Sequence, residues 1–109
     1  MVDWITVAQA GEIPPGKVKR VAASGLNLAV CNVAGNGDAG YYAIEDVCTH
    51  DGAELDQGEL RGCEIECPRH GARFDVRSGK ALCLPAVMPV PTFPLRIQGE
   101  EIQVQVAQP

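Results

Sequence analysis

The sequence predicts an all-β domain, and two observations carry that prediction. Short apolar or alternating stretches are divided by glycine and proline, and no segment keeps a helical period over a useful length. Near the end, Ile102, Val104 and Val106 alternate strictly with glutamine, so one strand face should meet the core and the other should meet water. At 109 residues the chain fits a single domain with a modest apolar core.

Four strands are expected in the N-terminal part of the chain. Residues 26–33 are almost entirely apolar or small, which is typical of a strand covered on both faces. Residues 35–40, GNGDAG, favour a turn, so the stretch that follows should return as the second half of a hairpin. The four predicted strands are DWITV, KVKRVA, LNLAVCNV and GYYAIED.

An irregular block, residues 45–83, separates these strands from the C-terminal ones. Its five glycines allow sharp turns and close approach of the backbone to a bound group. Its short strand candidates centre on Leu60, Ile65 and Phe74. We expect this block to be inserted into an antiparallel β-sandwich or barrel whose basal part is residues 1–44 and 84–109. A stiff, proline-rich segment then leads to a final hairpin of PLRIQ and IQVQV.

Composition narrows the possible functions. A formal charge of −5 argues against binding of nucleic acid, whose phosphates need a basic surface. No apolar run approaches the ~18 residues that span a bilayer, and the first residues lack a basic leader followed by an apolar stretch. We therefore expect a cytoplasmic protein that contacts no membrane. The five cysteines do not resemble a secreted disulfide framework, and none form a C-x-x-C pair, so thiol redox chemistry is not expected.

Charge is unevenly distributed along the chain. Residues 45–66 hold eight acids against Arg61 alone, whereas residues 67–80 hold four bases against Asp75. Two interpretations are open. The charges form either an ordinary solvated surface or a docking face that steers a partner protein.

Two Cys-His stretches use the whole histidine content of the chain. CTH at residues 48–50 is followed, after sixteen residues, by CPRHG at residues 67–71. Thiolate sulfur and neutral imidazole bind zinc or iron rather than magnesium or calcium. One zinc ion could take all four ligands, although structural zinc sites usually space cysteine with cysteine and histidine with histidine. Alternatively, a [2Fe–2S] cluster with two cysteines on one iron and two histidines on the other accounts for the mixed pairs.

These two motifs and their spacer closely resemble those of Rieske [2Fe–2S] proteins, and the resemblance extends over the whole chain. It implies a Rieske-type fold with a loop-rich cluster-binding subdomain inserted into the basal strands. It also implies the ligands: Cys48 and Cys67 on the buried iron, and His50 and His70 on the outer iron through Nδ1, with the opposite ring edge at the surface. Leu84-Pro85-Ala86 matches the family's proline loop, which covers one side of the cluster.

Within the family, the chain looks most like the small soluble ferredoxins of bacterial aromatic-ring dioxygenases. By that resemblance it is not an enzyme but an electron carrier. Its implied partners are an NAD(P)H-dependent flavin reductase and a terminal oxygenase, which dock transiently on the exposed histidine face. The alternatives are a ferredoxin of iron–sulfur assembly, a small subunit of another reductase such as nitrite reductase, and a structural zinc module.

Differences within the family point to its low-potential soluble branch. Rieske proteins of cytochrome complexes carry two further cysteines that join the loops, and the matching positions here are Ala53 and Arg69. Those proteins also place a serine and a tyrosine beside the cluster, where this chain has Ala72 and Phe74. Because hydrogen bonds to the sulfurs are one control of the potential, their absence predicts a value near the bottom of the Rieske range.

Overall fold

Ten short strands and one 3-10 turn make up the regular structure of the described residues, which are 4–33, 40–49, 52–69, 71–84, 86 and 88–106 of a computed structural model. The all-β prediction is confirmed. The elements are β1 (Trp4–Gln9), η1 (Ala10–Glu12), β2 (Val18–Ala23), β3 (Leu26–Asn32), β4 (Tyr41–Glu45), β5 (Glu59–Arg61), β6 (Glu64–Glu66), β7 (Arg73–Asp75), β8 (Thr92–Phe93), β9 (Leu95–Gln98) and β10 (Glu101–Gln105).

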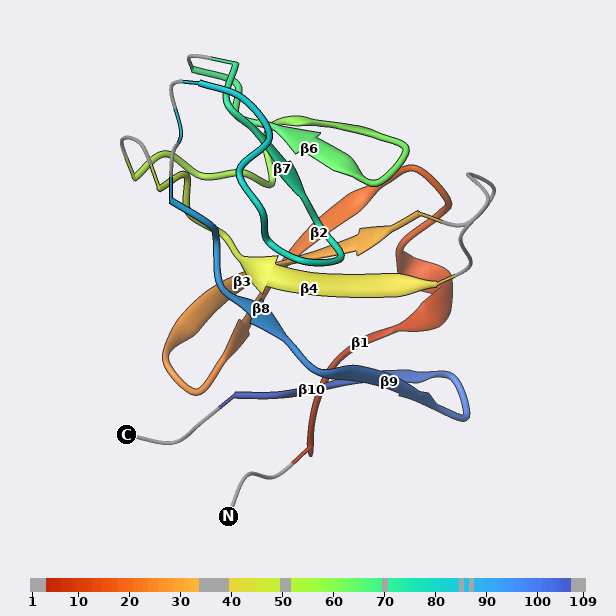
Figure 1. The fold of residues 1–109 in the computed structure, drawn as a ribbon. Helices are drawn as coiled ribbons and strands as arrows, with labels where there is room; N and C mark the ends of the chain where they lie inside the picture. Colours follow the sequence, from red (N-terminus) through yellow and green to blue (C-terminus); the bar gives the residue numbers. More distant parts are fainter. Residues whose placement is uncertain are drawn as a thin grey trace.

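The strands form three antiparallel sheets, with the orders β2-β3-β4-β8, β1-β10-β9 and β5-β6-β7. Figure 1 shows the β5-β6-β7 sheet on one side of the four-stranded sheet and the β1-β10-β9 sheet on the other. After β4 the chain leaves the four-stranded sheet, builds the small β5-β6-β7 sheet, and returns as β8 to pair with β4. This order fits the expected insertion, while the boundaries at residues 44/45 and 83/84 stay predictions.

Strand β3 lies between two apolar cores. Leu28 and Val30 belong to a core shared with the inward side chains of β10, and Ala29 and Cys31 belong to a second core shared with β6 and β7. All four side chains are fully buried. Because neighbouring residues of a strand point to opposite faces, a strand buried on both sides must be apolar at every position. The prediction of a doubly covered strand here is confirmed.

The C-terminal hairpin shows the predicted alternation. Ile102 and Val104 are fully buried, while Gln103 lies on the opposite face and hydrogen-bonds to Arg96 and Thr6. Gly99 supplies the positive φ of 65° in the two-residue turn between β9 and β10. The hairpin and β1 thereby form a sheet with one apolar face and one wet face.

The remaining strand predictions are also confirmed. β5, β6 and β7 contain Leu60, Ile65 and Phe74, and these three side chains pair across the small sheet on its inner face. The turn predicted at residues 35–40 lies outside the described residues except for Gly40. Among the described residues, no helix has the length and apolar character needed to cross a membrane.

Candidate metal centre

Two loops of the central block have the same backbone hydrogen-bond pattern. In each, the cysteine N–H donates to the carbonyl five residues later, and the cysteine carbonyl accepts from the N–H four residues later. The two distances are 2.7 and 2.7 Å in the loop of Cys48, and 2.7 and 3.1 Å in the loop of Cys67. The described residues of the C-x-H and C-x-x-H motifs and of the loops that follow them therefore share one backbone hydrogen-bond pattern.

A glycine closes each loop in a left-handed conformation. Gly52 has φ +79° and Gly71 has φ +76°, and nothing lies within 4 Å of the position that a Cβ would take at either residue. The requirement for glycine is therefore conformational rather than steric, since L side chains disfavour positive φ. Each glycine N–H is the donor to its cysteine carbonyl, so this conformation completes the pattern.

The two cysteines share one buried core. Cys48 and Cys67 are each 1% exposed, and both lie in the core that contains Leu55, Ile65 and Phe74. Neither forms a disulfide. Ala53 and Arg69, which the family resemblance matches to the two further cysteines that join the loops in other Rieske proteins, have no thiol. Two buried thiols, presented by matching loops from one apolar core, fit one iron of a [2Fe–2S] cluster.

His50 and His70, the other two predicted ligands, lie outside the described residues. The structure therefore brings together two of the four predicted ligands, and among the described residues no group of three or more metal-binding side chains is found. The complete ligand set stays a prediction.

A third segment, residues 82–90, is attached to both loops. Thr49 Oγ1 donates to the Met88 carbonyl at 2.7 Å, and Cys83 Sγ donates to the Gly71 carbonyl at 3.5 Å. This segment includes the predicted proline loop, of which Pro85 lies outside the described residues. Leu84 and Met88 are 76% and 61% exposed, so the surface beside the two loops is partly apolar.

The positions of Ala72 and Phe74 agree with the expected lack of hydroxyl donors. Both side chains are fully buried in the core that holds the two cysteines. The Ala72 carbonyl accepts the Cys67 N–H, which places residue 72 at the base of the second loop. Neither side chain can donate a hydrogen bond there.

Asp46 is a buried carboxylate that bonds to the residues directly after the first loop, and the sequence did not predict this role. Asp46 is 6% exposed, and its Oδ1 accepts the N–H groups of Leu55 at 2.7 Å and Asp56 at 2.8 Å. Its Oδ2 lies 3.5 Å from Arg20 Nε, and Arg20 Nη1 lies 2.6 Å from Glu54 Oε1. Burial, and next the adjacent Asp56 carboxyl, raises the pKa of Asp46 to about 6. The only signal in the sequence was an acid that directly follows a buried strand.

Two of the acids that follow the first Cys-His motif in the acidic block, residues 45–66, have partners inside the molecule. Glu54 pairs with Arg20, and Asp56 is half-buried and accepts a hydrogen bond from Gln57 Nε2 at 2.9 Å. Asp51 lies outside the described residues. The docking interpretation of the acidic block is therefore weakened at Glu54 and Asp56 and untested at Asp51.

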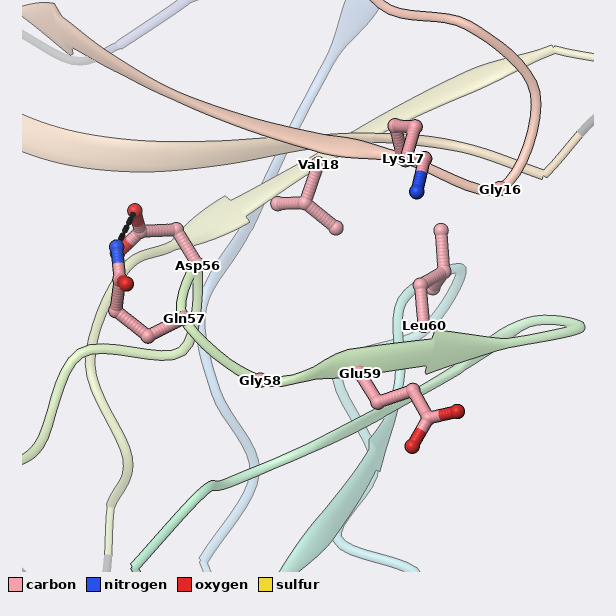
Figure 2. A pocket seen from close by; sticks show the side chains of 8 residues that line it. All are labelled: Gly16, Lys17, Val18, Asp56, Gln57, Gly58, Glu59 and Leu60. Atoms are coloured by element: carbon pink, nitrogen blue, oxygen red, sulfur yellow. Dashed lines mark hydrogen bonds between the residues drawn. The ribbon is translucent and has the colours of Figure 1, made fainter.

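A cleft of about 440 Å³ lies where the β5-β6-β7 sheet meets the start of β2. Figure 2 shows Val18 and Leu60 reaching into it from opposite sides, while the Glu59 carboxylate turns away. Neither Cys48 nor Cys67, the two predicted ligands that the structure describes, lines this cleft. It is a junction between two sheets and not the metal centre.

Comparison with known proteins adds a family to this geometry. A family model described as "Rieske [2Fe-2S] domain" matches residues 3–94. The ferredoxin component of the naphthalene 1,2-dioxygenase system of Pseudomonas aeruginosa is 39% identical over 104 residues, which are 95% of this chain and 96% of that protein.

Solved structures give the same fold. The chain superposes, with a TM-score of 0.87 and 36% identity, on a structure described as a complex of reduced oxygenase and oxidised ferredoxin in carbazole 1,9a-dioxygenase, covering 97% of this chain and 95% of that one. A putative NADH-dependent nitrite reductase small subunit from Mycobacterium tuberculosis has a TM-score of 0.83 at 22% identity, covering 100% and 99% of the two chains. At that identity the second likeness shows the fold alone.

Proposed function

Because the chain belongs to the Rieske [2Fe–2S] domain family, whose cofactor is a Rieske-type [2Fe–2S] cluster, we propose that it is a ferredoxin that carries single electrons to a terminal oxygenase. The observation that carries this proposal is the pair of matching loops, each with a buried cysteine, in a chain that aligns over nearly its whole length with a ferredoxin component of a dioxygenase system. The electron donor in this proposal is an NAD(P)H-dependent flavin reductase.

The proposed ligands are Cys48 and Cys67 on one iron, and His50 and His70 on the other. Support comes from the equivalent positions of the two cysteines in their loops and from their shared core. When bound, the cluster supplies a one-electron carrier whose neutral imidazole ligands make reduction easier than with four thiolates. The protein's own part is to hold the thiolates in fixed loops and to keep water from the buried side with Leu55, Ile65 and Phe74.

Docking is proposed at the face formed by the two ligand loops and residues 82–90. Leu84 and Met88 give this face an apolar contact area, and the formal charge of −5 favours partners with a basic surface. A reductase and an oxygenase that use one face would bind in turn, which suits a transient carrier. The proposed location is the cytoplasm, a reducing compartment, because the spacing of the cysteines does not resemble a secreted disulfide framework.

Spectroscopy on the purified protein tests the cofactor assignment first. We expect a red-brown protein with two irons and two inorganic sulfides per chain, and a rhombic EPR signal after reduction with dithionite. A colourless protein with one zinc per chain would contradict both the ligand set and the electron-carrier function.

Electron transfer tests the partner. The reduced protein is mixed in a stopped-flow instrument with the oxygenase of the carbazole 1,9a-dioxygenase system, and oxidation of the ferredoxin is followed. Transfer that saturates with oxygenase concentration supports the proposal. An intact cluster that exchanges electrons with nitrite reductase or cluster-assembly proteins, and with no oxygenase, would favour the alternatives. The 22% identity to the nitrite reductase subunit, against 39% to the dioxygenase ferredoxin, favours the oxygenase.

A further inference from the structure

The Asp46 carboxylate joins the two ends of the first ligand loop. Asp46 directly follows β4 and precedes Cys48 by two residues, whereas Leu55 and Asp56, whose N–H groups it accepts, come after the loop. Hydrogen bonds to a charged acceptor are stronger than neutral ones. The carboxylate therefore holds together the two ends of the segment that contains Cys48 and, by prediction, the ligand His50.

The second loop has the same backbone pattern without such a carboxylate. Asp46 lies two residues before Cys48. The residue two positions before Cys67 is Ile65, which is fully buried in β6. The loop fold therefore does not itself require an acid at this position. Asp46 introduces one negative charge on the Cys48 side only, so its effect is not limited to loop closure.

Arg20 supplies the countercharge from another strand of the sheet that contains β4. It lies on β2, at the edge of the four-stranded sheet, and its guanidinium spans Asp46 and Glu54. The Asp46 side chain has no exposed surface, so water does not screen its charge. Its Cα lies within about 7 Å of the Cys48 Cα, because two residues of extended chain span no more than that.

From this geometry we propose that Asp46 positions the Cys48 loop and that Asp46 and Arg20 together set the reduction potential of the cluster, with opposite signs. The added electron is disfavoured by the buried carboxylate and favoured by the guanidinium that offsets it. This inference rests on the proposed assignment of Cys48 as a ligand. The acids close to Asp46 are Glu54, which Arg20 also pairs, and Asp56.

The test is protein-film voltammetry of the cluster-loaded protein at pH 8, on Asp46→Asn and Arg20→Gln. Asparagine keeps an oxygen that can accept both N–H groups, removes the charge and turns an NH₂ group toward Arg20, so the potential should rise. Arg20→Gln should lower the potential, and Arg20→Lys should restore most of it. Glu12→Gln is the matched control, since Glu12 also accepts a backbone N–H, that of Gln9, and pairs with a base, Lys19, but it belongs to η1 and its side chain is exposed. Its potential should match the wild type.

Shifts of the same sign in Asp46→Asn and Arg20→Gln would overturn the electrostatic proposal, and so would two unchanged potentials. If Asp46→Asn fails to retain the cluster, the Arg20 variants still decide the sign. The positioning role is tested separately by hydrogen exchange: Asp46→Ala should lose protection at the Leu55 and Asp56 amides, and unchanged protection would refute it. A wild-type protein without iron would refute the proposed function before this stage, whereas an iron-loaded protein whose potential ignores both residues refutes only this inference.

Discussion

Thr49 Oγ1 donates a hydrogen bond of 2.7 Å to the Met88 carbonyl, across 39 residues of chain. This bond ties the first ligand loop to residues 82–90, and Thr49 stands between the two predicted ligands of that loop. The middle residue of CTH therefore has a structural partner of its own.

Thr49→Val should loosen this connection while keeping the shape of the side chain. A net contribution of about 0.5–1.5 kcal/mol for one hydrogen bond predicts that iron is released to a chelator about 2- to 12-fold faster. The control is Thr6→Val. Thr6 lies on β1, and its hydroxyl donates a hydrogen bond to Glu101 within the β1-β10-β9 sheet. Equal release rates in the two variants would show that the Thr49 bond does not hold the loop.

Replacement of the cysteines separates ligands from packed thiols. Cys48→Ala and Cys67→Ala should abolish the visible absorption of the cluster, and so should His50→Ala, because two irons with four protein ligands have no spare. Cys31→Ala, Cys63→Ala and Cys83→Ala should keep their colour. Burial raises the pKa of the Cys31 thiol to about 12, and Cys31 lies within β3, outside the two ligand loops. Loss of the cluster in Cys63→Ala as complete as in Cys67→Ala would refute the ligand assignment.

The glycines of the block should fall into two classes. Gly52→Ala meets open space but a φ of +79°, so it should cost about 1–2 kcal/mol of unfolding free energy and destabilise the cluster loop. Gly58→Ala has no conformational penalty, but its Cβ would lie 1.8 Å from the Glu66 carbonyl oxygen. Its cost should reach or exceed the ~3 kcal/mol of severe overpacking.

Denaturant unfolding of both variants measures these costs, with Gly16→Ala as the control. Gly16 has φ +82° in the turn before β2, with nothing within 4 Å of its Cβ position. Gly16→Ala should cost as much stability as Gly52→Ala without any faster loss of iron. A cluster equally labile in both would mean that global stability, and not the loop conformation, controls iron retention.

The sequence predicted the strands well because their signals are local. The alternation at Ile102 and Val104 and the unbroken apolar run at residues 26–33 each follow from which face of a strand is buried. The cysteine positions were also predictable, since the motif fixes residue type and spacing. Asp46 and Arg20 could not be found in this way. They are 26 residues apart, and their contact depends on how β2 and β4 pair with β3 between them, which no local pattern encodes.

The docking face makes a prediction about apolar contacts. Leu84→Ser or Met88→Ser should weaken association with the oxygenase about tenfold, since each removes apolar surface worth on the order of 1.5 kcal/mol when covered. Ile97→Ser is the matched control, because Ile97 is also an exposed apolar residue but lies on β9 of the distant hairpin sheet (Figure 1). The concentration of oxygenase that gives half-maximal electron transfer is the measurement. An equal loss in all three variants would place docking elsewhere.

The reduction potential offers the last test, because Ala72 and Phe74 are fully buried and carry no hydroxyl. Rieske centres span roughly −150 to +300 mV, and donors aimed at the cluster sulfurs stabilise the reduced, more negative state. We therefore expect the wild-type potential near the bottom of this range, and Ala72→Ser should raise it. Phe74→Tyr should raise it further if its ring edge faces the cluster.

The size of the rise follows from the strength of one hydrogen bond. A bond to a charged acceptor contributes about 1.5–3 kcal/mol, which for one electron is on the order of 60–130 mV. Because part of that is already present in the oxidised state, several tens of millivolts is the expected shift. Leu60→Met is a suitable control, since it repacks the same core without adding a donor. A wild-type potential well above zero, or a fall on adding the serine, would contradict the view that missing hydroxyl donors keep this cluster at low potential.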